Sequence, residues 1–240
     1  MLSKADIHIH TTCSDGLATP EELVDYIVAN SDLRVIAVTD HDTTAGGYAA
    51  QQHALRLGYH LDVIIGQEVT TDEGDILALF VQATLPTFRS ARAAIEAIHH
   101  QGGLAIAPSP YSAWDSLGHI VGLGSRIVQL PLDGVEVRHG FPANFMNAHN
   151  MARHYRHWCR LLPELGGSDS HSLFTVGQVF TWFPGRSAKD LRAAVARGVT
   201  WAGGPAWKLT CMAQRAAPMH PRSYYVGRST RAPYADGLSG

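Results

Sequence analysis

The chain has 240 residues, of which 45% are hydrophobic and 17% charged, and its formal net charge is -2 at neutral pH. This length and apolar content suit one large domain with a substantial core, and the charge offers no basic surface for duplex nucleic acid or an acidic membrane. No apolar run approaches the roughly 20 residues of a membrane span, and no signal-peptide pattern opens the chain, so we expect a cytoplasmic protein.

Short apolar runs rich in valine and isoleucine alternate with segments of helical pattern along most of the chain. We expect strands at residues 4–10, 34–40, 62–70, 75–82, 103–108, 133–139 and 176–183. This alternation predicts β/α units around a mainly parallel sheet. Residues 1–204 are expected to form one domain. Residues 205–240 are expected to form a C-terminal tail in which only residues 206–217 favour a helix.

Two of the expected helices carry clear start signals. Thr19 and Ser187 are each followed three residues later by an acidic side chain, Glu22 and Asp190 respectively, which is the pattern of a capping box. Gly102 follows a third helical run and is predicted to end it.

Histidines and carboxylates recur at the carboxyl ends of the expected strands. His8 and His10 close the first strand with one residue between them, so the two-residue period of a strand directs both imidazoles to one face. Four later segments add Asp40, His41 and Asp42, then Glu68, then Arg138 and His139, and finally Asp169 and His171. In a parallel β/α fold such groups collect at one edge of the sheet.

This convergence favours a metal centre over ordinary solvated loops. A single histidine at a strand end is usually a solvated loop residue, but five segments that deliver imidazoles and carboxylates to one edge are hard to explain by solvation. Buried acids and imidazoles are also costly without a cation to neutralise them. Mixed imidazole and carboxylate ligands favour Mn, Fe or Zn over Mg or Ca.

Six segments between residues 5 and 204 share a specific order and spacing. They read DIHIHTTCSDG, VIAVTDHDT, GQEVTT, GGLAIAPSPYSAW, DGVEVRHG and GGSDSHS. In these segments the sequence resembles the PHP (polymerase and histidinol phosphatase) family of metal-dependent phosphoesterases, and on this resemblance residues 1–204 would be the PHP catalytic domain.

The resemblance implies a distorted (β/α)7 barrel, similar to a TIM barrel, with divalent metals at its C-terminal mouth that serve to hydrolyse phosphate esters. The metal ligands that it implies form two sets. One metal would be held by His8, His10, Glu68 and Asp169, and the second by Asp15, His41 and His171. A hydroxide that bridges the two metals would then attack the phosphate ester.

The family's third metal depends on two further histidines, and this chain has neither of them. Their places are taken by Ser109 and Asp75. Serine is a poor ligand for a transition metal, and aspartate is adequate only where it points inward. The sequence therefore predicts about two divalent transition metals per chain, with Asp75 as a further candidate ligand.

Arg138 and His139 are candidates for the catalytic chemistry. A guanidinium matches the geometry of a phosphate oxygen, and an imidazole can protonate the leaving group or complete a metal shell. The expected partner is a small phosphorylated metabolite, a nucleotide or a short oligonucleotide, and neither duplex nucleic acid nor a membrane. The sequence specifies no oligomeric state.

Two other functions stay open at this point. The first is a PHP module that binds metal without turnover, which the residues at positions 75 and 109 would favour. The second is an amidohydrolase-type enzyme that cleaves C–N or C–O bonds, because that class also begins with an HxH strand. Such enzymes often use a bridging lysine on a central strand, and this chain has no lysine between Lys4 and Lys189.

Overall fold

The computed structural model describes residues 1–110, 122–140 and 162–204. Their elements in chain order are β1 (Leu2–Asp6), α1 (Pro20–Asn30), β2 (Leu33–Val38), α2 (Ala45–Leu57), β3 (Asp62–Val69), β4 (Ile76–Leu79), α3 (Ala91–His100), β5 (Leu104–Ala107), η1 (Gly124–Val128), β6 (Gly134–His139), β7 (Glu164–Gly167), β8 (Phe180–Pro184), α5 (Ala188–Ala196) and β9 (Trp201–Gly203).

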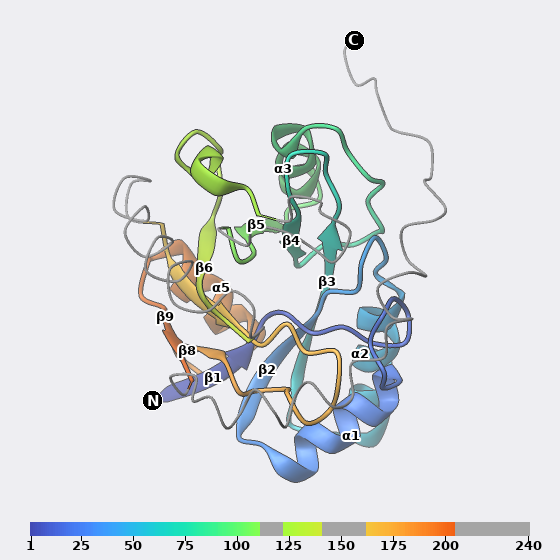
Figure 1. Cartoon of the computed structure of the whole chain (residues 1–240). Helices are drawn as coiled ribbons and strands as arrows, with labels where there is room; N and C mark the ends of the chain where they lie inside the picture. The colour runs from blue at the N-terminus through green and yellow to red at the C-terminus, as the bar shows by residue number, and fades with distance from the viewer. Residues whose placement is uncertain (111–121, 141–161, 205–240) are drawn as a thin grey trace, which may run out of the picture.

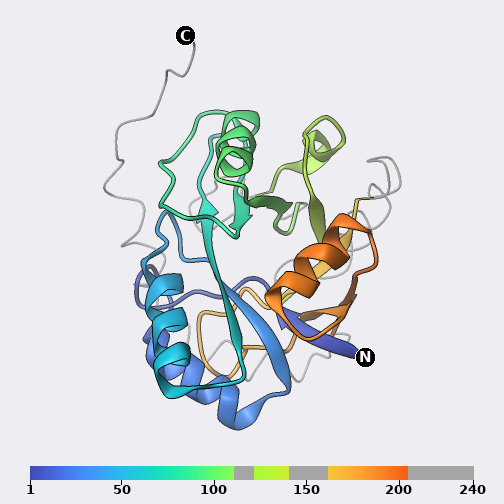
Figure 2. The same ribbon diagram turned by 180° about the vertical axis from the view of Figure 1, so that it is seen from behind.

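One nine-stranded sheet, in the order β7-β6-β5-β4-β3-β2-β1-β8-β9, curls into a nearly closed barrel (Figure 1). Helices α1 and α2 lie together on one side of this barrel, and α5 lies on another side, as the view from behind also shows (Figure 2). The predicted α/β barrel is therefore confirmed.

The sheet is mixed, whereas the sequence pattern predicts a mainly parallel one. The parallel neighbours are β1–β2, β2–β3, β5–β6 and β6–β7. The antiparallel neighbours are β3–β4, β4–β5, β1–β8 and β8–β9. Residues 70–75, which connect β3 to β4, are too few for the crossover of roughly a dozen residues or more that parallel neighbours require. Strand β4 therefore returns antiparallel to β3.

The first strand ends earlier than the sequence predicts, at Asp6, and the chain beyond it closes the barrel. Ile9 forms an isolated parallel bridge with Ser170, and the backbone N–H of His10 donates to the carbonyl of Ser170 at 2.9 Å. This short pairing joins the extension of β1 to the segment after β7, so residues from the two ends of the described chain meet at the carboxyl edge of the sheet.

The predicted helix boundaries at Thr19, Ser187 and Gly102 are confirmed. Thr19 and Ser187 each form a complete capping box, in which the hydroxyl accepts a backbone N–H and the acidic side chain three residues later accepts the N–H of the capping residue. Gly102 follows α3 with a φ of +75°, a conformation that glycine adopts readily. None of the described helices is long and apolar enough to cross a membrane.

Apolar side chains fill the barrel interior and include Ala5, Ile7, Val35, Ala37, Ile64, Leu77, Leu79, Ile106, Leu165 and Phe183. Leu191 on α5 packs against the same cluster. Because this interior is a packed core, it provides a rigid floor beneath the polar groups that follow the strands.

Candidate metal centre

Two groups of imidazoles and carboxylates form at the carboxyl edge of the barrel. We call the first the inner group, and it consists of His8, His10, Glu68 and Asp169. We call the second the outer group, and it consists of His10, Asp15, His41 and His171. In each group, one ligand atom from every residue lies within 4.8 Å of all the others. The memberships match the two ligand sets that the resemblance implies, except that His10 lies in both.

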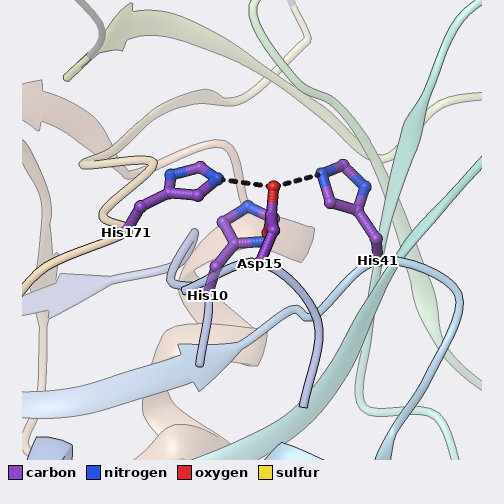
Figure 3. Close-up of side chains that lie close together, drawn as sticks. All are labelled: His10, Asp15, His41 and His171. Carbon is purple, nitrogen blue, oxygen red and sulfur yellow. Dashed lines mark hydrogen bonds and ion pairs between the residues drawn. The ribbon is translucent and has the colours of Figure 1, made fainter. Parts of the chain in front are cut away.

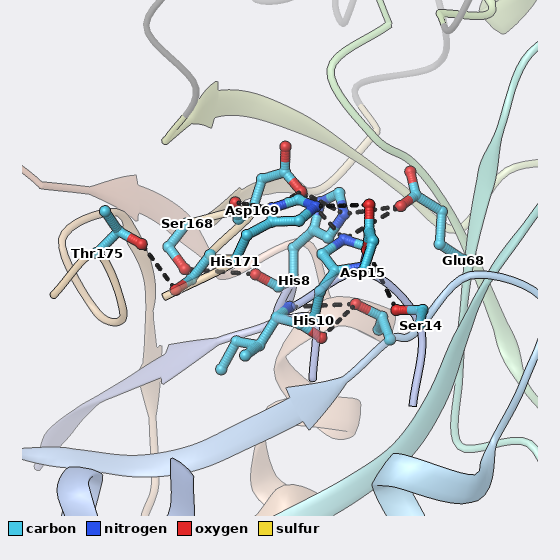
Figure 4. A network of polar contacts seen from close by, with 12 residues as sticks. His8, His10, Ser14, Asp15, Glu68, Ser168, Asp169, His171 and Thr175 are labelled. Carbon is cyan, nitrogen blue, oxygen red and sulfur yellow. Dashed lines mark hydrogen bonds and ion pairs between the residues drawn. The ribbon is translucent and has the colours of Figure 1, made fainter. Parts of the chain in front are cut away.

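The inner group is mostly buried and places two imidazoles against two carboxylates (Figure 4). Nε2 of His8 lies 3.3 Å from Oε2 of Glu68 and 3.3 Å from Oδ1 of Asp169. Nε2 of His10 lies 3.3 Å and 3.1 Å from the same two oxygens. All four side chains therefore direct a ligand atom at one small region.

The outer group surrounds the carboxylate of Asp15 with imidazoles (Figure 3). Oδ2 of Asp15 lies 3.2 Å from Nε2 of His171 and 3.8 Å from Nε2 of His41. Oδ1 of the same carboxylate lies 3.4 Å from Nδ1 of His10. His10 thus presents one ring nitrogen to each group.

Glu68 also connects the two groups, because one of its oxygens lies near imidazoles of both. Its Oε2 faces the inner imidazoles of His8 and His10, and it also lies 3.5 Å from Nδ1 of His41 in the outer group. A carboxylate in this position is able to contact cations in both groups.

Local backbone pairing explains why these loops meet. His41 and Glu68 form an isolated parallel bridge, which continues the β2–β3 pairing beyond the end of β2. On the other side, the Ile9–Ser170 bridge places His10 beside the loop that carries Asp169 and His171. Apart from the turn that carries Asp15, the segments with the candidate ligands thus belong to barrel strands or continue them.

Asp40 organises the loop that carries Asp15. It is fully buried and accepts the N–H of Thr11 at 2.7 Å, the hydroxyl of Thr11 at 2.8 Å and the hydroxyl of Ser14 at 2.7 Å. These three hydrogen bonds hold the turn that follows His10.

The electrostatics of the centre keep the carboxylates of Glu68 and Asp15 ionised. Burial alone would raise the pKa of Glu68, but His41 and His8 outweigh it and hold the pKa well below its usual range. Burial would also raise the pKa of Asp15, but the imidazoles of His171 and His10 outweigh burial and lower this pKa. Burial lowers the pKa of His10, but Asp169 and Glu68 outweigh this effect and raise it to about 10.

The donor set fits divalent transition metals. Imidazole nitrogens and carboxylate oxygens in groups of four are the ligands that such ions bind. Both ring nitrogens of His10 are buried without a hydrogen-bond partner among the described residues, although carboxylates face them. A buried imidazole in this state is suited to accept a cation between itself and those carboxylates.

Asp75, Ser109 and Arg138 lie outside both groups. Asp75 is buried, and Ser109 is held at a φ of +33°. Among the described residues no third group of metal-ligating side chains forms. Nη1 of Arg138 donates to the carbonyl of Gly204 at 2.8 Å, and the side chain of His139 lies outside the described part of the structure.

Sequence reasoning missed two buried carboxylates beside the centre. Glu136 on β6 contacts the His8 ring. Asp6 at the end of β1 accepts the N–H groups of Ser168 at 2.9 Å and Gly177 at 2.8 Å. The only signal for Glu136 is a charged residue at the centre of an apolar strand, in the segment DGVEVRH.

Family models match most of the chain. The PHP domain model matches residues 6–161, and a PHP-associated model matches residues 148–200. The tail that we predict at residues 205–240 lies beyond both matches and outside the described residues.

Similar proteins share parts of the sequence. The uncharacterized protein MJ1587 of Methanocaldococcus jannaschii is 39% identical over 145 residues, which cover 56% of this chain and 80% of that protein. The 5'-3' exoribonuclease Rnm of Salmonella typhimurium is 43% identical over 90 residues, which cover 35% of this chain and 30% of the exoribonuclease. The match thus spans less than a third of the exoribonuclease.

A solved structure shares the fold. It is a two-domain protein from Bacteroides vulgatus described as containing a predicted PHP-like metal-dependent phosphoesterase, with a TM-score of 0.70 and 20% sequence identity. The superposition covers 85% of this chain and 65% of that one.

Proposed function

The chain belongs to the PHP domain family of metal-dependent phosphoesterases, and from this premise we propose that it hydrolyses phosphate esters with two divalent transition metals, one in the inner group and one in the outer group. The observation that carries the proposal is the position of Glu68. Its carboxylate faces His8 and His10 on one side and His41 on the other, and this position supports one binuclear centre made of the two groups.

Each side chain has a defined task in this proposal. His8, Asp169 and Nε2 of His10 hold the inner cation, and Asp15, His41 and His171 hold the outer one. Nδ1 of His10 faces the outer group, and Glu68 contacts both cations. When bound, such a pair of cations polarises the phosphoryl group, lowers the pKa of a nearby water and stabilises the leaving oxygen. The buried, hydrogen-bonded loops keep these ligands in place before substrate arrives.

Arg138 and His139 are proposed to act on the substrate from the end of β6. The guanidinium of Arg138 is anchored through Nη1 to the carbonyl of Gly204, which leaves its remaining N–H groups to bind a phosphate oxygen. His139 is the neighbouring residue and is proposed to donate a proton to the leaving group.

We propose a nucleotide or a short oligonucleotide as the substrate, with a small phosphorylated metabolite as the other member of the same class. The similarity to an exoribonuclease supports the nucleotide, and the net charge of -2 disfavours a long duplex.

We also propose that the catalytic domain ends near residue 204. The matches to the family models support this boundary, because they end at residue 200.

The test is a hydrolysis assay with the full chain and added manganese. The substrates are p-nitrophenyl phosphate, its bis-ester, nucleoside monophosphates and 5'-labelled RNA oligonucleotides, and a His10→Ala variant serves as the control. We expect turnover of at least one phosphate ester that the variant lacks. Metal binding without turnover on the whole panel would contradict the proposal and favour a metal-binding module, the alternative that the residues at positions 75 and 109 keep open.

A further inference from the structure

Glu136 is a buried acid next to the proposed metal centre but outside both of its groups. It lies in the middle of β6, between Val135 and Val137, and its side chain is 0% exposed. A carboxylate in such a place is costly unless it is paired. Its neighbours are therefore informative about its task.

Both carboxylate oxygens of Glu136 lie close to Nδ1 of His8, the ring nitrogen that faces away from the inner group. Nδ1 of His8 lies 3.3 Å from Oε1 and 3.3 Å from Oε2. Oε2 also accepts the backbone N–H of Ser109 at 3.2 Å. The carboxylate is thus fixed by the loop after β5 on one side and contacts the His8 ring on the other.

The neighbouring strand leaves room for this contact. Gly167 ends β7, and a Cβ atom at that position would overlap Oε1 of Glu136 and lie 2.6 Å from Cβ of His8. A side chain at Gly167 would push the two residues apart. Glycine at this position therefore allows Glu136 and His8 to meet.

We propose that Glu136 is the positioning residue for His8. By accepting a hydrogen bond from Nδ1–H, it selects the tautomer in which Nε2 directs its lone pair toward Glu68 and Asp169, and it fixes the rotation of the ring. A histidine that ligates metal through one nitrogen commonly donates its other N–H to a carboxylate in this way. The inference rests on the proposed function, since it assigns His8 to a metal.

The test compares Glu136→Gln with Glu164→Gln in the full chain. Glu164 is a matched control, because it is also a buried glutamate on a barrel strand, but it accepts the N–H of Ala202 at the other end of β7. Each variant is titrated with Zn²⁺ and Co²⁺ by calorimetry, and the visible spectrum of bound Co²⁺ is recorded. Glu136→Asp is included as the conservative variant.

Glu136→Gln is expected to weaken the binding of one of the two metals by about 10- to 100-fold and to change the Co²⁺ spectrum. Glu136→Asp should recover part of the affinity, and Glu164→Gln should match the wild type in both readouts. Wild-type affinity and spectrum in Glu136→Gln would overturn the inference. An equal loss in Glu164→Gln would overturn it too, because the effect would then be general destabilisation.

These readouts separate the inference from the proposed function. Metal affinity is measured without substrate, so a wild-type protein that binds two metals and hydrolyses nothing would contradict the phosphoesterase proposal and leave the role of Glu136 intact. If Glu136→Gln does not fold, the Glu136→Asp affinity decides. Wild-type affinity there would overturn the inference, because the shorter side chain draws the carboxylate back from Nδ1 of His8 and should weaken this contact.

Discussion

The imidazoles of His10 and His171 stack with their centroids 4.3 Å apart and their planes 16° from parallel. His10 follows β1 and His171 follows β7, so the stack forms where the chain beyond β1 pairs with the segment after β7. The proposed metal ligands therefore depend on barrel closure, and measurements of metal binding also report on the integrity of the fold.

His10→Ala should remove both metals, whereas His41→Ala should remove only the outer one. The reason is that His10 presents Nε2 to the inner group and Nδ1 to the outer group, while His41 belongs to the outer group alone. Elemental analysis of protein purified without chelator measures the content, and circular dichroism checks the fold. We expect hydrolysis to fall by about 1000-fold or more in His10→Ala, since each cation contributes several kcal/mol. Equal metal contents in the two variants would contradict this sharing.

Metal binding should release protons and tighten as the pH rises. In the metal-free protein the neighbouring carboxylates outweigh the effect of burial on both histidines. They raise the pKa of His8 well above its usual value and the pKa of His10 to about 10, so both rings are positively charged near neutral pH. A metal needs the neutral ring. Calorimetry in Hepes and Tris at pH 8 should detect about one released proton or more per chain. Affinity that is independent of pH between 6 and 9 would show that these imidazoles are not ligands.

Gly46→Ala should weaken metal binding by the outer group, although alanine usually stabilises a helix relative to glycine. Gly46 lies in the first turn of α2, where a Cβ atom would overlap Oδ2 of Asp40 and lie 2.7 Å from Oγ1 of Thr11. Displacing Asp40 loosens the loop that carries Asp15. Gly47→Ala is the control, because its Cβ would meet Ile65 instead. We expect lower metal affinity in Gly46→Ala only, and similar affinities in both variants would refute the support role of Asp40.

Asp6 should make the metal-free protein less stable as the pH rises from about 4 to about 6. Burial raises the pKa of Asp6 to about 6, against the lowering effect of the Ser168 and Gly177 N–H groups. A raised pKa means that the folded state holds the proton more tightly than the unfolded state, so the contribution is complete below the unfolded pKa of 3.8 and is lost as the pH passes about 6. The loss is on the order of 3 kcal/mol.

Urea unfolding of wild type and Asp6→Asn, both with chelator, measures this effect. The difference in the free energy of unfolding should change across that range of pH, because asparagine does not titrate there. Parallel pH profiles would show that Asp6 ionises normally in the folded protein.

Much of the centre was predictable because its ligands follow local rules. The two-residue spacing of His8 and His10 points both rings to one face in any extended segment, and His41 and Glu68 directly follow apolar strands. The fold class could also be predicted, because the alternation of apolar strands with helical segments is a local sequence pattern too. The capping boxes of α1 and α5 depend only on neighbouring residues, and they too were predictable.

The remaining features depend on contacts between distant segments. Glu136 meets His8 only because β6, β7 and β1 come together when the barrel closes, and Gly167 matters only in that packing. Asp40 contacts Thr11 and Ser14 across two loops. The reversal of β4 follows from the short connection after Val69, which the apolar pattern of the strand itself does not reveal.

Crystals of the full chain grown with manganese or zinc would test the central claim directly, through an anomalous difference map at the metal's absorption edge. We expect two peaks, one about 2.0–2.3 Å from ligand atoms of the inner group and one at a similar distance from those of the outer group, with Glu68 between them. A single peak, or peaks away from these seven side chains, would contradict the binuclear centre.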